Sequence, residues 1–235
     1  MTNFIHWTTK EDFDTLMDLD GCVFKQNAPP KPSAQFVVDR IYDMLKPGAY
    51  CICWSPSAIS NDWALLLEDC QLEIKEQVAM LNQHCAYTMI VGMKPCEKNY
   101  AHNALVHGVA GLNINKLRIG DAKVGWNGLG KHGQTWTNKT CGFRNEQEAR
   151  PVSGRFPCNL ILDPVFKEQY SFSTEYFHVL DTSSDEKVFE FCLDMINPPS
   201  NNSMIIHPFA QDKVFETICK QRNQSCIIVN NGVAI

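Results

Sequence analysis

The segment that decides the fold lies near the end of the chain, at residues 204–230, which read MIIHPFAQDKVFETICKQRNQSCIIVN. Two short apolar runs, at residues 204–206 and 226–230, flank residues 213–222, whose pattern favours a helix. A strand, a helix and a second strand at this spacing predict a crossover that joins two parallel strands. We therefore expect an α/β protein built on a mostly parallel sheet.

The rest of the chain continues this alternation of strands and helices. Apolar runs predict strands at residues 4–5, 22–24, 50–54, 72–78, 88–92 and 159–162, and helical spacing predicts helices at residues 11–17, 33–45, 60–67 and 184–196. Ser33 stands at the start of the second helix, where its hydroxyl is expected to act as the N-cap. The order predicts a doubly wound, Rossmann-like sheet with helices on both faces.

Length and composition fit one folded domain. The 235 residues are 44% hydrophobic and 20% charged, which is typical of a globular domain and excludes a disordered or coiled-coil chain. No apolar run reaches the roughly 18 residues of a membrane span, and the N-terminus lacks the pattern of a signal peptide, so we expect a cytoplasmic protein without a membrane anchor.

The eleven cysteines include no C-x-x-C pair. In a chain of this length, that pattern favours reduced and mostly buried thiols over a disulfide framework. The histidines and cysteines that come closest to a zinc-ligand set are Cys85, Cys96, His102 and His107. Buried packing explains these residues better than zinc binding does, so we predict no metal site.

Charge is distributed unevenly along the chain. The net charge is −5, but residues 111–158 carry eight Lys or Arg against three Asp or Glu, so this stretch is +5 and the remainder −10. The stretch also holds eight of the thirteen glycines. We predict a single domain over residues 1–235 with a basic, glycine-rich insertion at about 111–158. Its expected DNA-contact residues, which pair cations with stacking aromatics, are Lys131, Lys139, Arg144, Arg150, Trp126 and Trp136. The alternative is a solvated surface loop whose positive charge is incidental.

Four short motifs resemble those of one known family. The most specific is GRFPCNLILD at residues 154–163, and the others are LKPG at 45–48, EDCQLEI at 68–74 and GLNIN at 111–115. In content and order they resemble the phage and prophage DNA amino-methyltransferases, which modify adenine N6 or cytosine N4 and whose catalytic motif precedes the cofactor motif. The resemblance spans nearly the whole chain, and it implies a methyltransferase fold and, in active members, S-adenosylmethionine as the cofactor.

The catalytic motif that the resemblance implies is altered in this chain. Active members carry D/N/S-P-P-Y/F/W after a strand, which provides an acceptor for the target amino group and an aromatic ring that stacks on the flipped base. The corresponding residues here are Ala28, Pro29, Pro30 and Lys31. Alanine cannot accept a hydrogen bond, and a lysine cation opposes the positive charge that develops on the methylated nitrogen. We therefore predict no catalytic residue here, and the alternative uses Asn27 as the acceptor.

The implied cofactor motif, D-P-F-x-G-x-G, is altered as well. Its equivalents are His207, Pro208, Phe209, Gln211 and Lys213. The leading acid and both glycines are therefore lost, and Asn230 stands where active members hold the ribose hydroxyls with an acid. Because each lost charged hydrogen bond costs about 1.5–3 kcal/mol, we expect no bound cofactor.

These motifs predict a pseudo-methyltransferase: a DNA methyltransferase-like protein of phage origin, in the host cytoplasm, that is catalytically inactive and binds DNA or a protein partner from a modification or restriction system. The alternative is an active S-adenosylmethionine-dependent DNA adenine-N6 or cytosine-N4 methyltransferase in which Asn27 and Asn230 replace the usual groups. A third hypothesis is a pure interaction protein that forms a homo-oligomer through exposed aromatic side chains. Those aromatics are Tyr170, Phe172, Tyr176 and Phe177.

Overall fold

The structure is a computed structural model that describes residues 4–7, 18–124, 152–155, 159–170, 177–196, 203–210 and 213–230. Its elements follow in the order β1 (Phe4–Trp7), β2 (Leu19–Lys25), α1 (Pro32–Met44), β3 (Leu45–Pro56), α2 (Ser60–Asp69), β4 (Glu73–Leu81), β5 (Ala86–Met93), α3 (Tyr100–Val106), β6 (Ile119–Val124), β7 (Val152–Arg155), β8 (Leu160–Leu162), α5 (Pro164–Tyr170), β9 (His178–Val179), α6 (Asp185–Ile196), β10 (Met204–Ala210), α7 (Val214–Gln221) and β11 (Ser225–Asn230).

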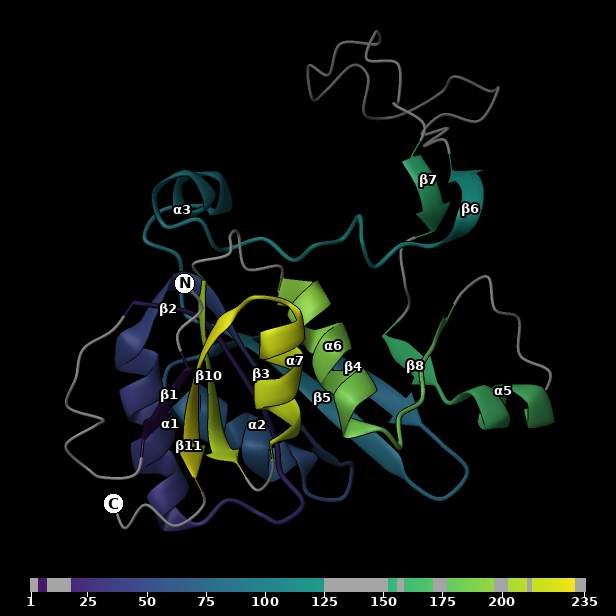
Figure 1. The fold of residues 1–235 in the computed structure, drawn as a ribbon, viewed down its shortest axis with the longest axis horizontal. Coiled ribbons are helices and arrows are strands. Elements are labelled where there is room, and N and C mark those ends of the chain that lie inside the picture. Colours follow the sequence, from purple (N-terminus) through teal and green to yellow (C-terminus); the bar gives the residue numbers. More distant parts are fainter. Residues whose placement is uncertain are drawn as a thin grey trace, which may run out of the picture.

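Within the described residues, nine strands form one sheet in the order β1-β11-β10-β2-β3-β5-β4-β8-β9 (Figure 1). Strand β5 runs antiparallel to both of its neighbours, β3 and β4, and all other neighbouring strands in this sheet are parallel. Strands β6 and β7 form a separate antiparallel ribbon. The prediction of a mostly parallel sheet is confirmed.

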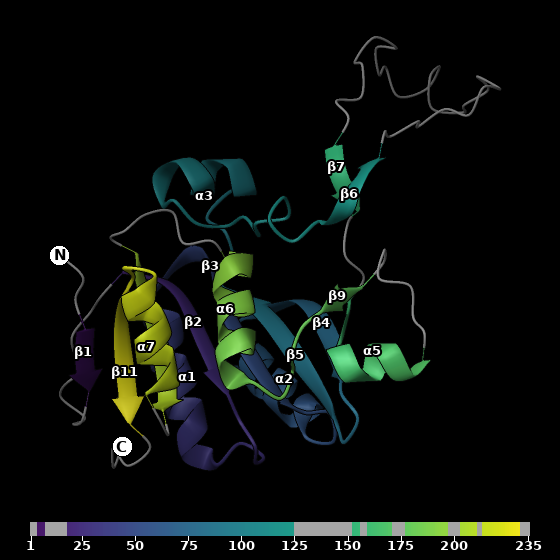
Figure 2. The ribbon, with the colours of Figure 1, turned by 45° about the vertical axis from the view of Figure 1, so that its right-hand side comes forward.

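Each face of the sheet carries its own hydrophobic core, because successive side chains of a strand point to opposite faces. On β3, Cys51 and Cys53 pack with the apolar side chains of α1 and α2. Ile52 and Trp54 of the same strand pack with α6 and α7. Figure 2 shows the helices on both sides of the sheet, which confirms the predicted doubly wound architecture.

The predicted strands and helices are present where the structure describes the chain, and the helix expected at residues 11–17 lies outside the described residues. The prediction of Ser33 as an N-cap is wrong. Helix α1 begins at Pro32, and its N-cap is Lys31, whose side chain makes no capping hydrogen bond. Proline at the first helical position has the required φ and no N–H group to be capped, so the helix starts two residues earlier than an N-cap at Ser33 would place it.

The order of the strands places a switch point between β10 and β2. The unit β10–α7–β11 progresses toward one edge of the sheet, and the unit β2–α1–β3 progresses toward the other. In open α/β sheets, ligands bind outside the carboxyl ends of the strands at such a point. The residues that follow β2 and β10 therefore form the first place to look for a functional site.

The segment that leads to the ribbon lies at the opposite, amino-terminal end of the parallel strands (Figures 1 and 2). The backbone N–H of Asn113 donates to the carbonyl of Met195 in the last turn of α6, at 2.8 Å, and Lys116 pairs with Asp194 of the same turn. The Arg118 guanidinium donates to the Gly154 carbonyl at 3.2 Å and so joins this segment to β7. Among the described helices, none is long and apolar enough to cross a membrane.

Candidate functional site

His207 lies in β10 and is only 5% exposed. Its Nδ1 is 2.7 Å from the carbonyl oxygen of Val23 on the neighbouring strand, so Nδ1 carries the proton and donates. The ring packs edge-on against Phe189 at 5.0 Å and tilted against Phe215 at 4.9 Å between ring centroids. This imidazole, at the position that the resemblance assigns to the acid of the cofactor motif, is therefore held inside the core between α6 and α7.

Phe209, two residues later, occupies a backbone conformation that is rare for residues with a side chain. Its φ is +62°, and the register between β10 and β11 shifts between His207 and Ala210. The Phe209 ring packs against Phe24 at 5.6 Å and against Trp63 at 6.1 Å between centroids. A left-handed conformation costs about 1–2 kcal/mol for a non-glycine residue, so aromatic packing holds this turn in place.

The loop from β2 to α1 carries the positions that the resemblance assigns to the catalytic motif, and Asn27, Ala28 and Lys31 in it are exposed. The indole Nε1 of Trp63 on α2 donates to the Ala28 carbonyl at 2.9 Å. The backbone of this loop is thus fixed from the α2 side. The structure brings Asn27 and His207 to the carboxyl ends of two adjacent strands, β2 and β10.

A cavity of about 360 Å³ opens at the same edge of the sheet, beyond the ends of β2, β4 and β8. Its lining residues are Lys25, Asn82, Gln83, His84, Cys85, Tyr87, Asp163, Val165, Thr182 and Ser183. Sequence reasoning missed this cavity, because its walls come from a hairpin and two loops that lie far apart in the chain. Only Asp163 fell within a motif that the sequence singled out.

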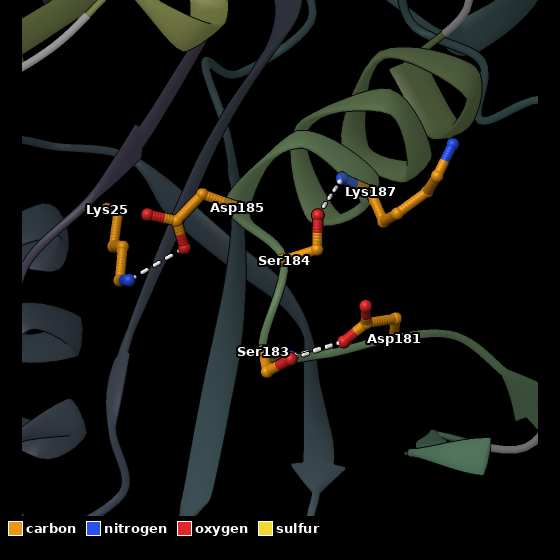
Figure 3. A network of polar contacts seen from close by, with 6 residues as sticks. All are labelled: Lys25, Asp181, Ser183, Ser184, Asp185 and Lys187. Carbon is orange, nitrogen blue, oxygen red and sulfur yellow. Dashed lines mark hydrogen bonds and ion pairs between the residues drawn. The ribbon is translucent and has the colours of Figure 1, made fainter.

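The loop before α6, with Thr182 and Ser183, forms one wall of this cavity, and Figure 3 shows polar contacts of this loop and of the start of α6. Lys25, at the end of β2, points to Asp185 in the first turn of α6, with Nζ and Oδ1 2.7 Å apart. The Asp181 carboxylate accepts hydrogen bonds from the N–H and hydroxyl of Ser183, which hold the pKa of Asp181 below its usual value. The ion pair joins the end of β2 to the start of α6, the helix that precedes β10.

The remaining predicted site residues belong to the rest of the cofactor motif and to the basic insertion. Gln211 and all six expected DNA-contact residues, Lys131, Lys139, Arg144, Arg150, Trp126 and Trp136, lie outside the described residues. Lys213 is exposed and stands at the N-cap of α7, without a side-chain capping bond. The backbone of Asn230 ends β11, where it pairs with Ala210 of β10.

The cysteines behave largely as the sequence predicts. Cys22, Cys51 and Cys53 are buried free thiols, whereas Cys85 is exposed and Cys96 is partly exposed. Burial raises the pKa of Cys22 and of Cys53 well above the usual value, so both thiols stay protonated and unreactive. Within the described residues, no group of three His, Cys, Asp or Glu side chains is arranged to hold a metal ion.

The sequence matches no protein-family model, and no curated protein matches it. Solved structures do share its fold. TTHA0409 of Thermus thermophilus, assigned as a DNA modification methylase and solved with S-adenosyl-L-methionine, has a TM-score of 0.54 at 8% identity, with 100% of this chain and 89% of that chain covered. The cytosine-N4-specific PvuII DNA methyltransferase has a TM-score of 0.54 at 8% identity, with 98% and 82% covered. This chain has the fold of the DNA methyltransferases.

A third structure with this methyltransferase fold is the complex of M1.HpyAVI with SAM, at 12% identity and a TM-score of 0.50, with 98% of this chain and 92% of that chain covered. The shared fold confirms the architecture that the motifs implied. At such low identity the comparison concerns the fold alone. The phage origin and the loss of methyl transfer stay predictions.

Proposed function

We propose that this methyltransferase-fold protein does not transfer methyl groups and instead binds DNA through its basic insertion at residues 111–158. The position of His207 is the main support for the loss of methyl transfer. Where active members of the family place an acid for the cofactor, this chain has an imidazole that donates to Val23 and packs against Phe189 and Phe215. A ring held in this way offers no carboxylate to a ligand.

The loop of the catalytic motif supports the same proposal. Ala28 has no acceptor in its side chain, and its carbonyl already accepts the Trp63 indole N–H. Lys31 is exposed at the start of α1, where the motif requires an aromatic ring to stack on a base. The chain therefore lacks the acid that the family uses for the cofactor, and it lacks the acceptor and the aromatic ring that the family uses for the target base. The surrounding fold is retained.

The DNA-binding part rests on charge and placement. Residues 111–158 carry +5 on a chain whose remainder is −10. Strands β6 and β7 both belong to this stretch, and their ribbon lies beyond the amino ends of the parallel strands (Figure 1). The altered motifs lie at the opposite, carboxyl ends of these strands. DNA held by the insertion need not reach the methyltransferase edge, which fits a binding role without catalysis.

Calorimetry with S-adenosylmethionine tests the loss of catalysis. We expect no binding at millimolar cofactor and no transfer of labelled methyl to DNA. Micromolar binding together with transfer to adenine N6 or cytosine N4 establishes the active-enzyme alternative, in which case Asn27→Ala and Asn230→Ala should each abolish transfer.

A gel-shift series in increasing salt tests the DNA-binding part. We expect the logarithm of the association constant to fall linearly with the logarithm of salt, by about 0.9 per phosphate contact. The double variant Lys131→Ala with Lys139→Ala should reduce this slope, and Lys187→Ala, an exposed lysine on α6 outside the insertion, should leave it unchanged. If the wild-type protein shows no salt-dependent affinity, DNA is excluded, and a protein of a modification or restriction system becomes the partner to seek by affinity capture.

A further inference from the structure

Asp194, in the last turn of α6, holds two cations that come from different parts of the chain. Its Oδ1 atom accepts hydrogen bonds from Nζ of Lys116, in the basic insertion, and from Nη2 of Arg222, the C-cap of α7, each at 2.5 Å. The side chain of Lys116 is 50% exposed, and those of Asp194 and Arg222 are each 27% exposed. A ligand at the surface can therefore reach all three members of this Asp194 cluster.

The Asp194 cluster lies at the root of the basic insertion. The N–H of Asn113 donates to the carbonyl of Met195, the residue after Asp194, at 2.8 Å. Four residues later, Leu117 is buried and belongs to the same hydrophobic core as Met195. Helix α6 ends at the amino-terminal end of the parallel strands, where the ribbon of β6 and β7 extends from the fold (Figure 2). The chain on both sides of Lys116 is thus fixed to α6, on the side of the molecule that is proposed to bind DNA.

The charges of the Asp194 cluster bear directly on DNA binding. Lys116 and Arg222 contribute two positive charges, and Asp194 contributes one negative charge. A carboxylate repels a phosphate and competes with it for the same cations, because both anions accept charge-assisted hydrogen bonds from lysine and arginine. Each cation that stays on Asp194 is one phosphate contact fewer for DNA.

We propose that Asp194 restrains DNA binding by masking Lys116 and Arg222, and that these two cations contact DNA phosphates once its carboxylate is displaced or neutralised. The inference rests on the proposed binding of DNA by the insertion. It extends the contact surface from the insertion to Arg222, a residue that follows α7 and lies more than sixty residues further along the chain.

Gel shifts in increasing salt with Asp194→Asn test the proposal. The amide keeps the shape of the side chain and removes its charge, and the fold should be retained because partly exposed ion pairs add little to stability. We expect tighter DNA binding than wild type, with a salt slope that is steeper by about 0.9 for each released cation. This slope makes the gain shrink about three- to fourfold per cation between about 50 mM and 200 mM salt. Binding equal to or weaker than that of wild type overturns the proposal.

Two further variants separate masking from a general effect of charge. Glu186→Gln changes the net charge by the same amount on the same helix, about 12 Å along α6 from Asp194 and beyond the screening length of about 10 Å at 0.1 M salt. Its DNA affinity should equal that of wild type, and a gain as large as that of Asp194→Asn refutes masking. Lys116→Ala and Arg222→Ala, added to Asp194→Asn, should return the salt slope to about the wild-type value. A slope that stays steep also refutes masking.

The outcomes also separate this inference from the proposed function. DNA binding by Asp194→Asn but not by the wild type supports masking and refutes DNA binding by the natural chain. Salt-dependent binding by the wild type that Asp194→Asn leaves unchanged refutes masking alone. If neither protein binds DNA in a salt-dependent manner, both proposals are wrong.

Discussion

The Nδ1 atom of His207 on β10 lies 2.7 Å from the carbonyl oxygen of Val23 on β2, across the switch point of the sheet. This bond needs a donor on the side chain. An ionised carboxylate at the same place cannot donate, so this bond would be lost if position 207 held the acid that the resemblance implies. The core between α6 and α7 is therefore built around the imidazole.

We expect His207→Asp to destabilise the protein by about 3 kcal/mol, since it buries a carboxylate against a carbonyl oxygen and leaves that oxygen unpaired. His207→Asn is the matched control, because its amide N–H can still donate to Val23. Urea unfolding measures both free energies. An Asp variant as stable as the Asn variant, or one that gains S-adenosylmethionine binding without loss of stability, contradicts this account of the site.

Gly48, near the start of β3, has no room for a side chain. Its φ is +79°, and a Cβ atom there would lie 2.7 Å from the Cβ of Ala110 and 2.8 Å from Nδ2 of Asn103. We expect Gly48→Ala to cost about 2 kcal/mol or more in the free energy of unfolding, from the left-handed backbone and the two contacts. Gly111→Ala is the control, because no atom lies within 4 Å of its Cβ position. Similar thermal stability of the two variants would refute the packing of residues 103–110 against β3.

Asp20 joins three strands at the amino end of the sheet. It is almost fully buried, its Oδ1 pairs with Lys46 at 2.6 Å, and its Oδ2 accepts the Met204 N–H at 2.8 Å. We expect Asp20→Ala to lower the free energy of unfolding by about 2–3 kcal/mol, because it removes a charged acceptor from two donors. Asp43→Ala breaks the more exposed pair with Arg40 and should cost less than about 1 kcal/mol. Equal costs in urea unfolding would show that the buried pair contributes no more than a surface pair.

Hydrophobic periodicity was sufficient to predict most of the fold. The apolar runs of β2, β3 and β10 and the helical spacing of α2 and α6 are local signals, and each is confirmed. The pairing of strands is not local. Neither the antiparallel course of β5 nor the pairing of the N-terminal β1 with β11 can be predicted from either segment alone, because the partner strands lie elsewhere in the chain.

The candidate site likewise combines features that the sequence predicts with features that only the folded structure reveals. Ala28, Lys31 and His207 could be named from the sequence because they interrupt motifs with fixed spacing. The burial of His207 could not be predicted from the sequence, since it depends on Phe189 and Phe215 from two helices. The cavity beyond β2, β4 and β8 carried no local signal, because its walls come from the hairpin after β4, the start of α5 and the loop before α6, which lie far apart in the chain.

His178, at the start of β9, should make stability depend on pH. Its ring packs against Phe191 at 5.0 Å between centroids, and its Nε2 has no hydrogen-bond partner in the described part of the chain. Burial lowers the pKa of His178 below its ordinary value, and a hydrogen bond to the backbone of Leu117 offsets only part of this. His178 also lines a small cavity beside β4 and β8, separate from the one at the carboxyl edge, and Glu76 is the acidic side chain among the described residues that line it.

Because the pKa of His178 is lower in the folded chain than in the unfolded chain, the unfolded chain takes up its proton first as the pH falls. Its contribution to stability is complete above the unfolded value of about 6.5 and is lost as the pH falls through the folded value, by up to about 1.4 kcal/mol per pH unit. His178→Gln should flatten the fall in unfolding free energy between about pH 7 and pH 5, and His84→Gln, at an exposed hairpin position, should not. Parallel pH profiles for wild type and His178→Gln would show that the ring is already protonated or solvated in the folded protein.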